Sequence, residues 1–390
     1  MPTKALFQFR SIFIGSPQIF ALLLLLGFVL QCGWLILHLP FSPAEQDHIW
    51  SGRLELEYGS MPRKFLYSPL VNIAASAPLK LDAHRIMRKD PTPEHVRREV
   101  ARLRWMLRLP FVGMGLLLGV SIWYVARRLY GNQGGYIALM LYCFSPAMVL
   151  RGATIDEALP AAWGIFGVVF TAIAISHNLY APWRKWRYRT VLLSVALAIA
   201  VASHPAAMLL APVAFLFMLY LAPGRRWASV AVMLFAVLAA AVLVSAAYSF
   251  RPQPMLNGID LRAWLAYRPA MARSMLLGDV PAFISRFNPA VFMLLLISLI
   301  TYFAWQRTRY FGNTAPLMVT AGLGYVALIT PLALTASIWM LPFVFVFIGG
   351  IWADLLETKK WQWAMGALLL LLAENIWFCW TMVGAASTAK

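Results

Sequence analysis

The stretch that decides the fold is SPAMVLRGATIDEALPAAWGIF, residues 145–166, where two long apolar runs meet. Few polar residues separate the two runs: Arg151, Thr154, Asp156 and Glu157. A connection this short lies at or just inside a membrane surface, where an ionised carboxylate is costly and usually has a function. The stretch therefore predicts a helical hairpin in a membrane protein, with Asp156 and Glu157 as candidate functional acids.

The composition indicates an all-α polytopic membrane protein. The 390 residues are 61% hydrophobic and 12% charged, with a mean hydropathy of +0.71, which excludes a soluble domain. A net charge of +18 would suggest nucleic acid for a soluble chain, but here the charges follow the loops and no nucleic-acid partner is expected. We expect one membrane domain over residues 1–390, without a separate soluble domain, in contact with membrane lipids.

Apolar runs long enough to cross a membrane predict about eleven transmembrane helices. Pro205 divides the fifth run from the sixth, and we interpret His204 and Pro205 as a genuine turn on the outer side. The predicted spans are residues 17–38, 108–126, 133–150, 157–176, 190–203, 205–222, 227–248, 289–305, 314–332, 337–356 and 362–383.

The basic residues of the short connections predict the orientation. Alternate connections carry 14 Lys and Arg residues, against Arg151 alone on the opposite side. The positive-inside rule then places the N-terminus in the cytoplasm and the C-terminus outside. We expect a bacterial inner (plasma) membrane protein whose active site faces the periplasm.

Both long loops, residues 39–107 and 249–288, fall on the predicted outer side. The first contains an apolar segment too short to span, 66–79, which we expect to lie in the interface, and a basic helix at 93–108. Cations on the outer face could hold a lipid-linked phosphate through charge-assisted hydrogen bonds, and Arg102 and Arg104 are candidates for that contact. A solvated charged face is the alternative.

A second group of acids lies just after the first predicted helix, with His48 beside them: Glu45 and Asp47. A carboxylate there could act as a general base towards a hydroxyl or bind a cation. The structural alternative is an ordinary polar turn, just as Asp156 and Glu157 could simply cap a helix.

Other polar residues have open interpretations. His204 could contact phosphate or be structural, and Glu374 with Asn375 could be functional or hydrogen-bond a neighbouring helix. The three cysteines, far apart in the sequence, form no metal or redox motif and are predicted to be buried: Cys32, Cys143 and Cys379.

The chain resembles the GT-C glycosyltransferases, and within them the bacterial branch of the aminoarabinose transferase and the protein O-mannosyltransferases. The match is best over about residues 100–175, in RLPFVGMGLLLGVSIWYVARRLYG and IALMLYCFSPAMVLRGATIDEALPAAWGIFGVVF. DHIWSGRLELEYGSMPRKFLYSPL resembles the family's acidic first loop more loosely. The resemblance implies a GT-C fold, with a catalytic carboxylate in the first outer loop and a second acid before the fourth helix.

Carried over by motif, Asp47 is the expected general base, Asp156 its partner and Glu45 the alternative base. The family's usual Asp-Glu pair is Glu45-Gln46-Asp47 here, and a Lys common before the sixth helix is replaced by His204. The candidates for contact with the substrate or its phosphate are Arg151, His204, Arg102, Arg104, His48 and Glu157. A divalent metal ion, if used, would be held by Asp47 and Asp156.

The resulting hypothesis is an inverting glycosyltransferase that uses a polyprenyl-phosphate sugar on the outer face. Its acceptor would be a hydroxyl of a lipid, glycan or protein. One alternative is a non-catalytic subunit with the same fold and membrane-protein partners. Another is a transporter of lipid-linked sugars, which we disfavour because few polar residues interrupt the predicted spans.

Overall fold

The computed structural model is helical throughout the part that it describes, which contains no β-strand. The described residues are 16–58, 68–82, 93–182, 184, 186–257, 288–329, 333–359 and 361–388. The α-helices are α2 (Ser16–His38), α3 (Pro43–Tyr58), α4 (Pro69–Asp82), α5 (Pro93–Cys143), α6 (Pro146–Gly152), α7 (Ala158–Ser176), α8 (Arg187–Ser203), α9 (Ala211–Leu221), α10 (Arg226–Ala247), α11 (Pro252–Asn257), α15 (Pro289–Ala304), α16 (Phe311–Ile329), α17 (Ala333–Leu356) and α18 (Trp361–Thr388).

Helices occupy the described part of every stretch that was predicted to span a membrane. Six of the described helices are long and apolar enough to do so, and two shorter ones, Pro205–Leu221 and Pro289–Ala304, are also apolar. The chain is therefore an all-α membrane protein, as predicted, while the count of eleven spans stays a prediction. Lys4 and Arg10, which support the predicted orientation, lie outside the described residues.

Helix α5 is two antiparallel helices joined at Gly131. Gly131 has φ 76° and ψ −171°, a backbone conformation that would be strained in an L residue with a side chain. Two contacts require the reversal: the Tyr142 hydroxyl donates to the Gly115 carbonyl at 2.6 Å, and a Cβ on Gly135 would lie 3.0 Å from Arg127 Cβ. The predicted second and third spans are thus a hairpin with a very short turn.

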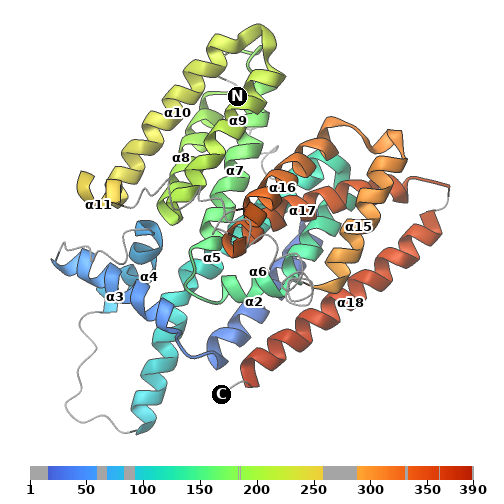
Figure 1. Ribbon diagram of the computed structural model, residues 1–390. Coiled ribbons are helices and arrows are strands. Elements are labelled where there is room, and N and C mark those ends of the chain that lie inside the picture. Colours follow the sequence, from blue (N-terminus) through green and yellow to red (C-terminus); the bar gives the residue numbers. More distant parts are fainter. Residues whose placement is uncertain are drawn as a thin grey trace, which may run out of the picture.

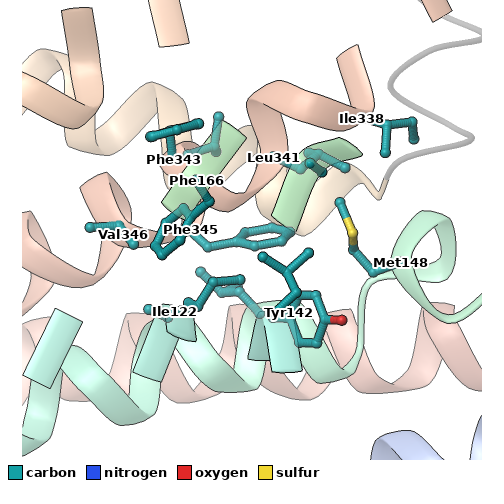
Figure 2. Close-up of a cluster of buried hydrophobic side chains, with 14 of the residues drawn as sticks. Ile122, Tyr142, Met148, Phe166, Ile338, Leu341, Phe343, Phe345 and Val346 are labelled. Carbon is teal, nitrogen blue, oxygen red and sulfur yellow. The ribbon is translucent and has the colours of Figure 1, made fainter. Parts of the chain in front are cut away.

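The centre of the bundle is α17, which packs against α5, α7 and α16. Within their most apolar windows, 94% of α17 residues are buried, against 28% in α10 and in α18. Figure 2 shows side chains of α17 such as Phe345 meeting Phe166 of α7 and Tyr142 of α5. Helices α10 and α18 lie at the edges (Figure 1), where a face rich in Leu, Phe and Trp suits contact with lipid.

Helices α3 and α4 lie side by side at the end of the bundle where α5 begins (Figure 1). They approach closely because Gly52 has no side chain: a Cβ there would be 2.0 Å from the Asn72 carbonyl oxygen. Helix α4 covers most of the apolar segment predicted at 66–79, and the basic helix predicted at 93–108 continues into the membrane part of α5. Of the second long loop, 249–288, residues 258–287 lie outside the described part.

Candidate functional site

The connection between α6 and α7 is organised by an ion pair. Arg151, in the last turn of α6, donates from Nη1 to Asp156 Oδ2. Asp156 Oδ1 accepts the backbone N–H of Ala158 at 2.8 Å, so this carboxylate also satisfies a donor at the start of α7. Asp156 thereby holds Arg151, whose side chain remains 28% exposed and can present its other donors to an anion.

Glu157 links two further elements to the same place. Its Oε2 accepts a hydrogen bond from Ser68, the residue before α4, and its Oε1 lies 3.7 Å from His204 Nε2. His204 ends α8 in an extended conformation because Pro205 follows it directly. The outer turn predicted at His204 and Pro205 therefore faces the acidic hairpin.

The surroundings of His204 are buried and acidic. Burial lowers the pKa of His204 below its ordinary value, and the carboxylates of Glu157 and Asp156 oppose that shift. The edge of the imidazole meets Trp339 of α17, with ring centroids 5.1 Å apart. The second ring nitrogen, Nδ1, is buried and makes no hydrogen bond with any described residue.

The two acids at the start of α3 have different surroundings. Glu45 is buried, and its carboxylate accepts hydrogen bonds from both Nε and Nη2 of Arg108, each at 2.8 Å. It also accepts the backbone N–H of Ile155 at 3.0 Å and that of Ser42 at 2.8 Å, so both its oxygens are occupied. Glu45 is therefore part of the scaffold in this structure, and it ties α3 to the residue before Asp156.

Asp47 is exposed, and its carboxylate has no partner in the part of the chain described here. Only its backbone carbonyl is engaged, by the Ser51 hydroxyl at 2.6 Å. Its neighbour His48 is held by Asn72 of α4, with Nδ1 2.7 Å from Oδ1. Of the two predicted base candidates, Asp47 alone is free to meet a substrate.

Three of the basic residues on the first part of α5 are engaged in the scaffold. Arg104 donates to the carbonyl of Leu37 at 3.2 Å, and Arg108 to the carbonyls of Leu39 and Pro40 at 2.9 Å. These contacts satisfy carbonyl groups at and just beyond the C-terminal end of α2, where cations are favoured. Nη1 of Arg102 lies 3.6 Å from Oε2 of Glu99 on the same helix.

The structure thus brings together four of the predicted site residues: Arg151, Asp156, Glu157 and His204. It adds Ser68, which the sequence did not single out beyond the motif YSPL, although a Ser directly before a Pro is a usual start of a helix. The other predicted polar site, on α18, is separate: Asn375 accepts from Asn288 at 2.5 Å and so joins α18 to α15. Asn375 thus has the interhelical role that was one of its two interpretations.

A divalent metal does not fit the carboxylates seen here. No three His, Cys, Asp or Glu side chains of the described residues form a group that could hold a metal ion. Asp156 already has a guanidinium on one oxygen and an N–H on the other, and a cation next to Arg151 would be repelled. We therefore derive no step through a metal.

Comparisons with known proteins support the fold. Residues 100–250, which include the α6–α7 connection and His204, match the family model described as dolichyl-phosphate-mannose-protein mannosyltransferase. A search of curated proteins finds no match. Among solved structures, the chain is similar to the oligosaccharyltransferase AglB of the archaeon Archaeoglobus fulgidus in complex with an inhibitory peptide and a dolichol-phosphate.

That similarity has a TM-score of 0.59 at 12% identity, over 94% of this chain and 56% of AglB. An oligosaccharyltransferase of the same organism, in complex with Zn and sulfate, matches with a TM-score of 0.52 at 15% identity, over 84% of this chain and 45% of the other. The chain thus spans about half the length of these proteins. The fold is of the GT-C type, as the sequence resemblance implied.

Proposed function

We propose that the chain is a glycosyltransferase that moves a sugar from a polyprenyl-phosphate donor to a hydroxyl acceptor. The observation that carries this proposal is the gathering of Arg151, Asp156, Glu157 and His204 at one end of a GT-C bundle. The mannosyltransferase family model covers the same residues. A basic side chain held by an acid, beside a buried imidazole, is suited to the phosphate of a lipid-linked sugar.

In the proposed reaction Asp47 takes the proton of the acceptor hydroxyl, since its carboxylate is exposed and unpaired in the described structure. The hydroxyl oxygen attacks the anomeric carbon, and the bond from that carbon to the phosphate oxygen breaks with inversion. The lipid phosphate leaves with the electron pair. Arg151 and His204 stabilise the charge that develops on it in a partly dry site.

Asp156 and Glu45 serve the reaction indirectly in this proposal. Asp156 orients Arg151, and Glu45 fixes the start of α3 against Ile155, so that Asp47 is carried on a helix anchored next to the phosphate site. The sidedness remains part of the proposal: the site faces the outer (periplasmic) side of a bacterial inner membrane, with a cytoplasmic N-terminus. The acceptor is a hydroxyl of a lipid, glycan or protein.

The test is transfer by the purified protein. It would be reconstituted in lipid and incubated with a panel of labelled polyprenyl-phosphate sugars and membrane extract, and the labelled product would be identified. We expect one sugar to be transferred, and Asp47→Asn to reduce turnover by about 10²- to 10⁴-fold while the protein stays folded. Unchanged turnover in Asp47→Asn would refute Asp47 as the base.

A non-catalytic subunit of a membrane assembly is the second candidate, and one observation favours it. If Glu45, fixed by Arg108, is the Glu of the family's Asp-Glu pair, the Asp of that pair is replaced by Ala44. Stable co-purification with other membrane proteins, and no turnover with any lipid-linked sugar, would support this candidate over the enzyme.

A further inference from the structure

Three side chains from three elements form a connected row at the candidate site. Ser68 at the start of α4 donates to Glu157 at the start of α7, and Glu157 faces His204 at the end of α8. Ser68 is buried, with 2% of its surface exposed. The row joins an outer-loop helix to the residue that the proposed function places at the phosphate.

We propose that Ser68 and Glu157 are positioning residues, which orient His204 so that its unpartnered ring nitrogen contacts the phosphate of the lipid-linked donor. The inference rests on the proposed function and extends it, because it says which groups orient the His204 ring and which ring nitrogen contacts the phosphate. His204 is the residue that touches the phosphate, and Ser68 and Glu157 act through it.

The geometry supports an ordered row. A hydroxyl on Oε2 fixes the plane of the Glu157 carboxylate and directs Oε1 towards His204 Nε2, 3.7 Å away. At this distance the two atoms do not hydrogen-bond, but the negative Oε1 favours a proton on the facing nitrogen, Nε2, and leaves Nδ1 as the nitrogen for the substrate. That other nitrogen, Nδ1, has no partner among the described residues, and a buried polar atom without a partner is unfavourable until a ligand supplies one.

The charges around His204 indicate how a phosphate would change it. Glu157 and Asp156 face it from the start of α7, with Arg151 paired to Asp156, and the ring of Trp339 of α17, which packs against it, carries no charge. Burial keeps the pKa of His204 low in the free protein, so the imidazole is neutral near pH 7. A bound phosphate adds a second anion opposite Glu157, which favours the imidazolium.

Donor binding should therefore take up a proton at His204. The sign follows: the bound state has the higher pKa, so affinity is greatest at low pH and falls as pH rises through the two values. A positioning role predicts that loss of Glu157 or Ser68 weakens this effect. A merely structural role for either residue would change stability without changing the pH profile.

The experiment measures binding of a polyprenyl methyl phosphate to the full chain in lipid nanodiscs. This diester keeps one negative charge from about pH 5.5 to about pH 8.5, so only the protein titrates, and the unphosphorylated polyprenol is the reference lipid. For the wild type we expect an affinity that falls about tenfold over this range. This measurement needs no variant and so does not depend on one folding.

Variants separate the roles of the three residues. At pH 7 we expect Glu157→Gln to weaken binding about tenfold, and Ser68→Ala to weaken it in the same direction by less. His204→Lys should bind at all these pH values with a flat profile, because its ammonium stays charged. Ser76→Ala is the matched control: Ser76 is also buried on α4, but its hydroxyl donates within α4, to the carbonyl of Asn72 at 2.8 Å.

The outcomes distinguish the inference from the function beneath it. Preference for the phosphate over the alcohol, with a flat pH profile or with Glu157→Gln and Ser68→Ala binding like Ser76→Ala, would refute the positioning role and leave the proposed function standing. Equal binding of the two lipids by the wild type would refute both.

Discussion

Glu45 and Glu157 lie close together in the fold, yet their surroundings are opposite. Glu45 is 2% exposed, and an Arg and two backbone N–H groups occupy both of its oxygens. Glu157 is 32% exposed, accepts one hydroxyl and faces an imidazole whose Nδ1 has no partner in the described part of the chain. A carboxylate whose bonds are all used holds elements together, whereas one that is half-exposed and joined to a titratable neighbour can respond to a substrate.

The largest effect on stability should come from breaking the buried ion pair between Glu45 and Arg108. Arg108→Ala leaves Glu45 buried without its partner, and we expect a loss of about 3–5 kcal/mol in the free energy of unfolding. Thermal unfolding in detergent, followed by tryptophan fluorescence, would measure it. The double variant Glu45→Met with Arg108→Met is the control and should recover only part of the loss, because it removes the unpaired buried charge but leaves backbone groups such as the Ile155 N–H and the Leu39 carbonyl without these partners. Equal stability of Arg108→Ala and the wild type would show that the pair does not hold α3.

A smaller effect, on binding and turnover only, is expected at the site. Arg151→Ala removes the cation that Asp156 orients, so binding of a lipid phosphate should weaken about 10- to 100-fold while unfolding changes little. Binding of a polyprenyl phosphate would measure it, with Arg53→Ala as a control, because Arg53 is exposed and, among the described residues, pairs with Glu57 on its own helix. If Arg53→Ala weakens binding as much as Arg151→Ala does, the loss of affinity comes from a general loss of positive charge and not from the site.

The structural role of Glu45 can be tested further through Ser42, which also hydrogen-bonds to it. Ser42 and Glu45 form a reciprocal pair at the start of α3: the Glu45 N–H donates to Ser42 Oγ at 3.2 Å and the Ser42 N–H donates to Glu45 Oε2 at 2.8 Å. Ser42→Ala should cost about 1 kcal/mol in the free energy of unfolding and leave transfer per folded molecule unchanged. A selective loss of transfer would mean that the start of α3 does more than support Asp47.

A third glutamate, Glu55, extends the comparison to a buried acid whose Oε1 has no hydrogen-bond partner among the described residues. Burial raises the pKa of Glu55 on α3 from 4.5 to about 7, against the opposing effect of Arg251. Since the folded state binds this proton more tightly than the unfolded state, Glu55 makes stability fall as pH rises from about 4.5 to about 7. Glu55→Gln should remove this slope and gain on the order of 1 kcal/mol at pH 8. An unchanged slope of unfolding free energy against pH would contradict the prediction.

Much of the fold could be predicted because single residues and local patterns determine it. Apolar run lengths located the membrane helices, Pro205 marked the end of α8, and the short polar stretch at Asp156 marked the hairpin. The three cysteines are buried and free, as predicted, but no local pattern indicates that Gln31 links two of them. The Gln31 side chain accepts a hydrogen bond from the Cys379 thiol at 3.2 Å and donates one to the Cys143 carbonyl at 3.1 Å.

The division between scaffold and site was harder to predict, because it depends on pairs that are distant in the chain. Arg108 is 63 residues from Glu45, and Ser68 is 89 residues from Glu157. Local spacing held one usable signal: Ser42 three residues before Glu45 is a capping motif and indicates a structural Glu. No comparable pattern marks Ser68, whose role comes from where α4 lies against α5 and α8.

The most direct test of this division compares Glu45→Gln with Glu157→Gln, with stability and sugar transfer measured on the same preparations. We expect Glu45→Gln to unfold more easily but, in the molecules that stay folded with α3 in place, to transfer normally. Glu157→Gln should keep its stability and lose transfer. A folded but inactive Glu45→Gln, beside a fully active Glu157→Gln, would contradict the account.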